Sequence, residues 1–326
     1  MTPVVTILMA VYNAEAWLEQ ALESLLVSQT LKDVEVIAVD DASTDGSPDI
    51  LRRWEALDNR LRVMKMEENS GQGKARNLAL NYARGEFVTM VDADDWLSAD
   101  ALQSAVDVFR QHPQTDTVVF RLVKYWQESG KEEPYAEPYG EKDVLSGKEA
   151  FEKSLDWTIH GLYMVRRELH LRYPYDTHYR LYSDDNTCHL HYLHSREVRL
   201  CKGIYYWRKH EESSTTHFSP NRFLHMMANL DLRETLKREG VDKDIVAQYD
   251  KHRWHNYLGL LWLYFRHRGE MNKEERARVR EDFRKVHATF DRSWPYACFV
   301  ANQWVRYEIK GLTTKTLSRQ GGSFNL

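Results

Sequence analysis

Three aspartates stand close together where an apolar run of the chain ends. In GEFVTMVDADDWL, residues 85–97, the apolar residues are followed by Asp92, Asp94 and Asp95. Neighbouring carboxylates repel one another, and an ordinary turn does not require three of them. Carboxylate oxygens are the ligands that Mg²⁺ and Mn²⁺ prefer. The segment therefore predicts a site for a divalent cation, or for a cationic partner, at the end of a strand.

The elements that must position these acids alternate between strand and helix. We expect strands at 4–11, 34–40, 61–66, 86–91 and 117–122, and helices at 13–29, 47–57, 73–83 and 99–111. Strict alternation is typical of a parallel, doubly wound α/β sheet. Ligands of such sheets bind beyond the carboxyl ends of the strands. Asp40 and Asp41, which close the second strand, fall at the same edge as the first three aspartates.

Polar residues at the expected helix starts suggest caps. Asn13 is a candidate N-cap of the first helix, and Ser47 precedes Pro48 in the second. Asp95 is a candidate cap of a helix that begins near Leu97. Each cap would satisfy backbone N–H groups that the first turn of a helix leaves without partners.

Composition places the chain among soluble globular proteins. It has 326 residues, of which 42% are hydrophobic and 29% charged, with a net charge of −4. No apolar run reaches the length of a membrane span, we expect no signal peptide, and three dispersed cysteines suit a reducing compartment. Cytoplasmic location is therefore the expectation.

Positive charge gathers toward the C-terminus, where the sequence becomes helical from about Asn221. Residues 251–326 contain 15 Lys and Arg against 7 Asp and Glu. One reading is a peripheral contact with an anionic surface, such as the inner face of the plasma membrane or a diphosphate-bearing acceptor. A solvated basic helix face explains the same composition equally well.

Four segments in this order closely resemble the family-2 glycosyltransferases, which have the GT-A fold. They are VTILMAVYNAEAWLEQALESLLVSQT, EVIAVDDASTDGSPDIL, NSGQGKARNLALNYARGEFVTMVDADDWL and YSDDN, and the resemblance covers about residues 3–215. The resemblance implies a GT-A catalytic domain over 1–220, with a nucleotide-binding half at about 1–100 and an acceptor half at about 101–220. Residues 221–326 then form an α-helical extension.

The resemblance implies a Mn²⁺ or Mg²⁺ ion held against the diphosphate of a nucleotide sugar. Asp92-Ala93-Asp94 matches the family's D-x-D element, with Asp94 as the more direct ligand and Asp92 near the ribose or the metal. His210 is a candidate third metal or phosphate ligand, with His217 as its alternate. Arg208 is a candidate phosphate contact.

The nucleotide pocket implied by the resemblance lies at the ends of the first two strands. Its lining includes Ala10, Val11 and Tyr12. Asp41 is expected to accept a hydrogen bond from a uracil-type base, while Asp40 orients the loop. Arg76 matches a basic residue near the base and diphosphate, although an arginine on a helix is as often solvent-exposed.

The catalytic base implied by the resemblance is Asp185 in YSDDN. One carboxylate suffices to take the proton of an attacking hydroxyl. Asp184 stands where the family more usually has Glu, and an exchange of roles between Asp184 and Asp185 stays open. The nearby run CHLHYLH, residues 188–194, contains several metal-ligand types, but we expect a helix with His189 and His191 in structural positions.

The resulting hypothesis is an inverting transfer of one sugar from a nucleotide-diphosphate sugar, UDP-linked, to a glycan or lipid-linked acceptor. Family analogy suggests a bacterial surface polysaccharide such as lipopolysaccharide or capsule. One alternative is a metal-dependent phosphatase of the haloacid-dehalogenase type, which leaves AVYNAEAWL and VDDASTDG unexplained. A catalytically inactive nucleotide-binding subunit is the other, and it would have no need of Asp185.

Overall fold

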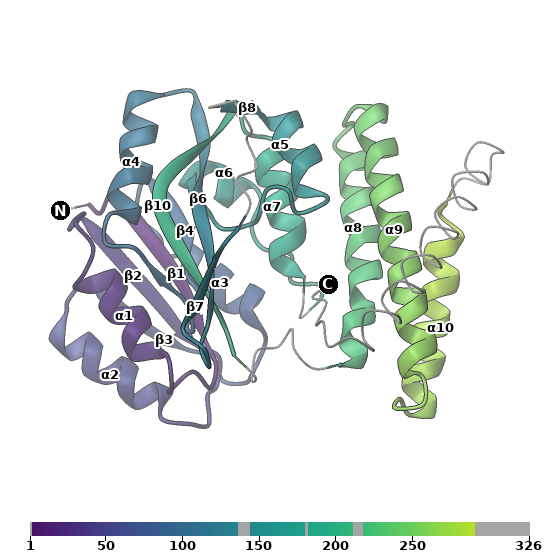
Figure 1. The fold of residues 1–326 in the computed structure, drawn as a ribbon, viewed down its shortest axis with the longest axis horizontal. Coiled ribbons are helices and arrows are strands. Elements are labelled where there is room, and N and C mark those ends of the chain that lie inside the picture. Colours follow the sequence, from purple (N-terminus) through teal and green to yellow (C-terminus); the bar gives the residue numbers. More distant parts are fainter. Residues whose placement is uncertain (1, 136–143, 180–181, 211–217, 291–326) are drawn as a thin grey trace. The chain divides into compact units, whose positions relative to one another are not determined.

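The computed structural model describes residues 2–135, 144–179, 182–210 and 218–290 (Figure 1). The chain divides into two compact units, Met1–Ala228 and Asn229–Leu326. The first unit carries every residue to which the sequence assigns a site role, and His217 among these lies outside the described residues.

The first unit is built on one mixed sheet. Its strands are β1 (Val5–Val11), β2 (Val34–Asp40), β3 (Leu61–Lys65), β4 (Phe87–Met90), β5 (Trp96–Leu97), β6 (Thr115–Trp126), β7 (Lys131–Pro134), β8 (Val144–Ser146), β9 (Tyr163–Arg166) and β10 (Glu197–Lys209). The strands follow the order β3-β2-β1-β4-β9-β6-β10-β5, while β7 pairs with β6 and β8 with β10.

The parallel part of the sheet places the carboxyl ends of several strands at one edge. β3, β2, β1 and β4 pair in parallel, as do β6 and β10. β9 lies between β4 and β6 and is antiparallel to both. The α/β expectation is confirmed: the sheet is mostly parallel, with β9 reversed in its middle and the short strands β5, β7 and β8 antiparallel to their partners.

Helices cover both faces of this sheet. The described helices of the first unit are α1 (Leu18–Leu26), α2 (Ser47–Leu57), α3 (Gln72–Leu80), α4 (Ala101–Gln111), α5 (Gly147–Ser154), α6 (Arg167–Arg172) and α7 (Ser183–Leu193). Alternate residues of β1 point to opposite faces, so Val5 and Ile7 pack with α1, α2 and α4, whereas Leu8 packs with α3. The core therefore holds β1 and β4 rigidly from both sides.

Two expected caps are wrong, because these polar side chains connect loops. α1 begins at Leu18, and Asn13 has a left-handed backbone (φ 49°). Its Oδ1 accepts a hydrogen bond from the backbone N–H of Thr44 at 2.8 Å. The N-cap of α2 is Gly46, while Oγ of Ser47 accepts from the N–H of Ala14 at 2.9 Å. The loops after β1 and β2 are thus tied together beside the nucleotide pocket that the sequence predicts.

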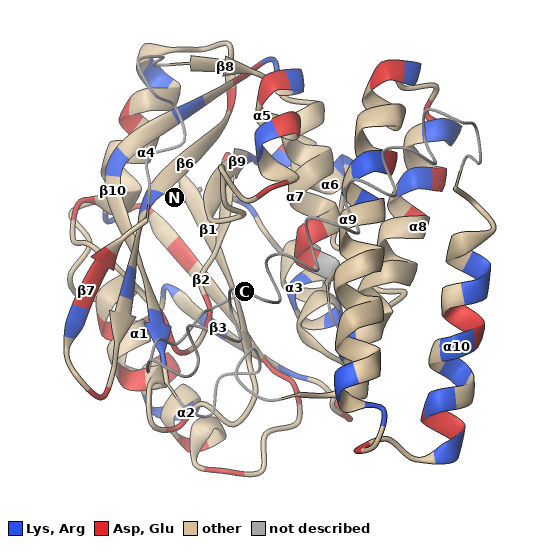
Figure 2. Ribbon diagram, turned by 45° about the vertical axis from the view of Figure 1, so that its right-hand side comes forward, with Lys and Arg blue, Asp and Glu red and all other residues tan. Residues whose placement is uncertain are grey.

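The second unit is helical, as expected. α8 (Leu224–Arg238) leads into it, and α9 (Lys243–His267) and α10 (Lys273–His287) follow. An aromatic core joins α9 to α10 through stacked and edge-on rings of Trp254, Tyr257, Phe283 and Phe290. Lys and Arg alternate with Asp and Glu along α10 (Figure 2). Within the described residues, no helix is both long and apolar enough to cross a membrane.

Gly85 sets the start of β4, and we predict that replacing it by alanine destabilises the first unit. A Cβ there would lie 2.5 Å from the backbone nitrogen of Thr6 and 2.8 Å from the carbonyl carbon of Val5. Backbone atoms cannot move aside cheaply, so Gly85→Ala should lower the free energy of unfolding by about 1–3 kcal/mol in urea titrations. Gly269→Ala is the control, since nothing lies within 4 Å of its added Cβ. Equal stability of the two variants would contradict this account.

Candidate functional site

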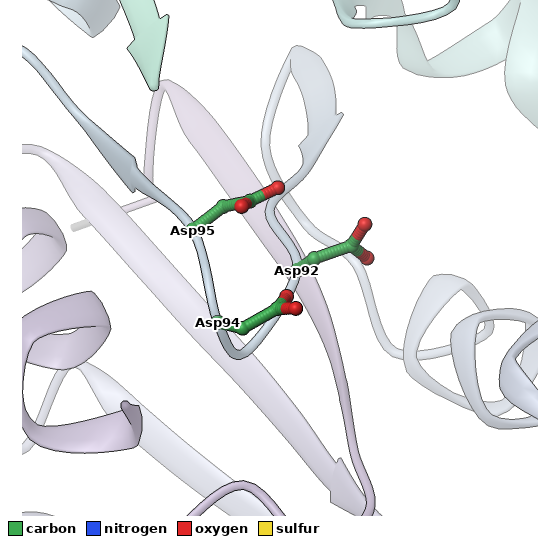
Figure 3. A group of neighbouring side chains, drawn as sticks. All are labelled: Asp92, Asp94 and Asp95. Atoms are coloured by element: carbon green, nitrogen blue, oxygen red, sulfur yellow. The ribbon is translucent and has the colours of Figure 1, made fainter. Parts of the chain in front are cut away.

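The side chains of the three aspartates extend from one tight turn that follows β4 (Figure 3). The N–H of Asp95 donates to the carbonyl of Asp92 at 3.1 Å. One carboxylate oxygen from each of Asp92, Asp94 and Asp95 lies within 4.8 Å of the others. The turn is therefore what brings the three carboxylates together.

Asp94 lies beside the end of β10. Oδ2 of Asp94 is 3.1 Å from Nε2 of His210, whose ring is 5.1 Å from the ring of Trp17. Burial and the neighbouring charge of Asp92 raise the pKa of Asp94, while His210 opposes this shift. The expected partnership of Asp94 and His210 is therefore present in space, although 116 residues separate them in sequence.

Asp95 serves the fold, and its expected role as a helix cap is wrong. It is 2% exposed. Its Oδ2 accepts from the hydroxyl of Tyr205 at 2.8 Å, and its Oδ1 accepts from the backbone N–H of Arg208 at 2.7 Å. Burial, followed by the charges of Asp94 and Asp92, raises its pKa well above the ordinary carboxyl range. β5 follows directly, and α4 begins only at Ala101.

Arg208 is buried by the protein and fixes the aspartate turn. Its guanidinium carbon lies 4.8 Å from the ring centre of Trp17 and 4.5 Å from that of Trp96. Its Nε donates to the carbonyl of Asp94 at 2.6 Å, and its terminal nitrogens donate to the side-chain carbonyls of Gln20 and Gln127. Because the residue is 2% exposed, the structure gives it a positioning role in place of the expected phosphate contact.

Arg76 connects the aspartate turn to the acid pair of YSDDN. It is fully buried in α3, so the exposed alternative is wrong. Its NH2 donates to Oδ1 of Asp92, and its NH1 is 4.0 Å from Oδ2 of Asp184. Burial alone would lower the pKa of Arg76, but the two carboxylates outweigh it and the net pKa is raised. The guanidinium therefore stays charged between two acidic segments.

The end of β1 offers backbone and one exposed ring to the same edge. Val11 is buried in the core, and its carbonyl accepts from the N–H of Asp41 at 2.8 Å. Ala10 is partly buried beside it, whereas Tyr12 is 49% exposed. Any lining role of Val11 must therefore come from its backbone, while Tyr12 has a ring surface available to a ligand.

The two acids at the end of β2, Asp40 and Asp41, both bind backbone N–H groups. Oδ1 of Asp40 accepts from Ser43 at 2.9 Å, in agreement with an orienting role. Asp41 accepts from Ser70 at 2.8 Å and from Gly71 at 2.7 Å, one bond to each carboxylate oxygen. Asp41 therefore holds the loop before α3 in place, and its contact with a base stays a prediction.

The acid pair lies in the first turn of α7. The side chains of Asp184 and Asp185 are 38% and 16% exposed. Burial and the charge of Asp184 raise the pKa of Asp185 well above the ordinary carboxyl range. Asp185 also faces His225. The sequence reasoning missed this histidine because it is part of no recognisable motif in the helical segment after Asn221.

The histidine run in α7 is structural, as expected. Nδ1 of His189 is 2.7 Å from Oγ of Ser154, and Nδ1 of His191 is 2.7 Å from the hydroxyl of Tyr163. Both rings are buried and bind different elements. Among the described residues, the group with metal-ligand geometry is the aspartate turn.

Comparison with known proteins identifies the family. The model named "Glycosyl transferase family 2" matches residues 6–177, a little over half of the 326-residue chain. The chain belongs to glycosyl transferase family 2.

Three curated relatives of this family-2 chain match between 36% and 66% of its length. Glycosyltransferase EpsH of Bacillus subtilis is 38% identical over 130 residues, which are 40% of this chain and 37% of EpsH. Glycosyltransferase EpsJ of the same organism is 31% identical over 227 residues, 66% of this chain and 64% of EpsJ. The poly(ribitol-phosphate) beta-glucosyltransferase of Bacillus spizizenii is 37% identical over 121 residues, 36% of this chain and 19% of that protein. The matched regions thus span less than two-thirds of each relative.

Solved structures confirm the GT-A fold of the family-2 chain. Residues 1–349 of S. aureus TarS in complex with UDP give a TM-score of 0.58 at 20% identity, covering 86% of this chain and 80% of that one. The mannosyltransferase PcManGT from Pyrobaculum calidifontis, in complex with GDP-Man and Mn²⁺, gives 0.54 at 20% identity, covering 96% and 88%.

The donor set of this family-2 site fits a divalent cation. Asp92 and Asp94 keep 36% and 34% of their side-chain surface exposed, so their oxygens are accessible. Both oxygens of Asp95 accept hydrogen bonds within the protein. The available donors are therefore two carboxylates and the His210 imidazole, a set that suits Mn²⁺ or Mg²⁺ together with phosphate oxygens.

Replacing Arg208 by lysine should destabilise the family-2 domain and loosen the aspartate turn. Lysine keeps the charge but cannot stack between two indole rings while donating to three separate oxygens. We expect Arg208→Lys to lower the free energy of unfolding by roughly 2 kcal/mol in urea titrations. Arg52→Lys on α2, where the arginine side chain is 74% exposed, is the matched control and should change it by less than about 0.5 kcal/mol. A small effect in both variants would show that Arg208 does not hold the turn.

Proposed function

We propose that this chain is an inverting glycosyltransferase that moves one sugar from a nucleotide-diphosphate sugar, UDP-linked, to a hydroxyl of a glycan or lipid-linked acceptor. The observation that carries the proposal is the buried Arg76, which brings the D-x-D aspartates and the acid pair to one edge of the sheet. A residue proposed to hold the diphosphate, Asp92, and the acid pair that contains the proposed base, through Asp184, therefore contact the same guanidinium.

The relatives support a role in surface-polysaccharide synthesis. One relative is named a poly(ribitol-phosphate) beta-glucosyltransferase, and another carries teichuronic acid biosynthesis in its name. Poly(ribitol-phosphate), which the first name contains, is a polymeric anion. We extend this class of acceptor to the present chain, with lipopolysaccharide and capsule as further members.

The acceptor half of the reaction requires a base, and Asp185 is the proposed group. The carboxylate of Asp185 takes the proton of the acceptor hydroxyl as that oxygen attacks the anomeric carbon. Direct displacement inverts the configuration, so an α-linked donor yields a β-linkage. Asp184 pairs instead with Arg76, which favours Asp185 as the base of the two acids.

The donor half of the reaction requires positive charge beside the departing diphosphate, to stabilise the negative charge that develops on it. Asp92, Asp94 and His210 are the residues that would hold Mn²⁺ or Mg²⁺ there. When bound, such an ion stabilises negative charge on the leaving phosphate oxygen as a Lewis acid. The chain's own contribution is to keep these ligands in place, through Arg76 on Asp92 and Arg208 on the carbonyl of Asp94.

The nucleoside is proposed to lie over the ends of β1 and β2. Ala10, the backbone of Val11 and the exposed ring of Tyr12 form one wall. Asp41 fixes the loop at Ser70 and Gly71 on the other side and keeps the carboxylate lone pairs not used there for a base N–H. Neighbouring structures contain UDP in one case and GDP-Man in another, so the choice of base belongs to the proposal.

The helical C-terminal region is proposed to serve the acceptor side. We propose a catalytic domain at 1–220 and an extension at 221–326 whose basic residues contact an anionic acceptor or the inner face of the plasma membrane. This gives a cytoplasmic enzyme with peripheral membrane contact.

Asp185→Asn should abolish transfer while nucleotide binding persists. Asparagine has nearly the same size but cannot take the hydroxyl proton, so we expect kcat to fall by at least about 100-fold. Release of UDP from UDP-sugars with Mn²⁺ and acceptor measures transfer, and calorimetry measures UDP affinity. Full transfer by this variant would refute the assignment, and release of inorganic phosphate by the wild type would favour the phosphatase alternative.

The acidic limb of the pH–rate profile should lie above the ordinary carboxyl range. Burial and Asp184 raise the pKa of Asp185, and only its deprotonated form accepts the proton. kcat should therefore rise as pH increases through that raised pKa. An acidic limb that falls within the ordinary carboxyl range would contradict Asp185 as the base.

Asp94→Ala should remove the metal dependence of nucleotide binding. The wild type should bind UDP more tightly with Mn²⁺ than after chelator treatment, by at least about tenfold, since a cation held by Asp94 would attract the anionic diphosphate. The variant should show the weaker affinity in both conditions by isothermal titration calorimetry. Asp107→Ala on the exposed face of α4 is the matched control. Equal UDP affinity in every condition would exclude a metal-bridged donor site.

A further inference from the structure

A histidine from the first turn of α8 faces the acid pair. Nε2 of His225 is 3.9 Å from Oδ2 of Asp185, and the two side chains are 23% and 16% exposed. Among the described residues, His225 is the basic side chain that Asp185 meets. The distance is about 1 Å longer than a hydrogen bond, a gap that catalytic groups commonly close when substrate binds.

Asn186 fastens the two helices that carry this pair. Its Nδ2 donates to the carbonyl of Ala228 in α8 at 2.9 Å and to Oδ2 of Asp176 at 3.1 Å. Ala228 lies one turn after His225, and Asn186 directly follows Asp185. The first turn of α8 is also anchored by the buried Met226. His225 therefore lies opposite Asp185 because both helix starts are held by one buried amide.

Tyr182 stacks on the imidazole of His225, with ring centroids 4.4 Å apart and 17° between the planes. Tyr182 has a left-handed backbone (φ 68°), which is costly for a bulky residue. Strain of this kind persists where the surroundings require it and is frequent at functional sites. Here it turns the ring of Tyr182 onto His225, three residues before the proposed base.

The charge states suit donation from His225 to Asp185. Burial lowers the pKa of His225 to about 4, so near neutral pH the ring is uncharged and one nitrogen carries a proton. The other titratable groups beside Asp185 in the described part of the chain are Asp184, Cys188 and Tyr182, and Arg222 lies near Tyr182. Arg76 acts on Asp184. The imidazole of His225 is the neutral nitrogen donor that lies beside Asp185.

We infer that His225 is a positioning residue, whose Nε2–H donates to Oδ2 of Asp185 and leaves Oδ1 directed at the acceptor hydroxyl. This inference rests on the proposed function, since it concerns the same base. The hydrogen bond orients the carboxylate and favours its deprotonated form. It assigns the beginning of α8 to the active site.

Three substitutions separate this role from simple packing. Phenylalanine at 225 keeps the stack on Tyr182 but has no donor. Glutamine places its amide nitrogen at about the reach of Nε2, whereas asparagine places it at the reach of Nδ1, one atom short of Asp185. We expect His225→Phe to lower kcat by about 10–100-fold with the donor KM within about twofold. His225→Gln should stay within about fivefold of the wild type and exceed His225→Asn.

The pH profile provides a readout that packing does not move. Without the donor, the deprotonated form of Asp185 is less favoured, so the acidic limb of kcat should shift to higher pH in His225→Phe. His225→Gln should keep the wild-type limb. His255→Phe on α9 is the matched control, because the ring of His255 binds the carbonyl of Lys251 in its own helix.

Each outcome decides whether His225 positions the carboxylate of Asp185. Wild-type kcat and pH profile in His225→Phe would overturn the inference. So would equal losses in His225→Gln and His225→Asn, or losses in His225→Gln as large as in His225→Phe, since these indicate a structural role. Asp185→Asn is measured alongside: full transfer by that variant would mean failure of the base assignment. Loss in Asp185→Asn with an intact His225→Phe would overturn the role of His225 alone.

Discussion

Negative charge crowded at one edge of the sheet is the constraint on which this structure depends. Asp92 and Asp184 lie 92 positions apart in the chain, and both face the buried guanidinium of Arg76. An arginine without such partners would be very costly to bury. With them, it stays charged and holds the end of β4 near the start of α7. The position of the aspartate turn relative to the acid pair therefore depends on the guanidinium of Arg76.

The aspartate turn divides its carboxylates between fold and ligand. Asp95 uses both oxygens on Tyr205 and Arg208, so its charge is absorbed by β10. Asp92 and Asp94 keep accessible oxygens, and the pKa of Asp94 is raised by burial and then by the repulsion of Asp92. The protein thus satisfies one acid of the cluster itself and leaves two carboxylates accessible. A turn in which the protein satisfied every acid would have little attraction left for a cation.

Long-range contacts from two later segments complete the site. β10 brings Arg208 and His210 to the turn after β4, and α8 brings His225 to the acid pair. In each case a side chain from late in the chain contacts or faces an acid presented by an earlier loop or helix start. The GT-A sheet explains why β10 meets the turn after β4. β4, β6 and β10 run in one direction, with β9 between β4 and β6, so the ends of β4 and β10 lie at the same edge.

The sequence by itself determined the alternation of elements, the family and the acids that line the edge. Those signals are local, because a hydrophobic period of two or 3.6 residues and a short motif each lie within one continuous segment of the chain. The tertiary structure alone decided what each polar side chain binds. Asn13 and Ser47 connect loops although their positions suggest caps, and Arg208 stacks between indoles although its motif suggests a phosphate. His225 carries no motif at all. Hydrogen-bond partners and burial depend on residues tens to more than a hundred positions away. A local sequence pattern does not predict which of these distant residues will make the contact.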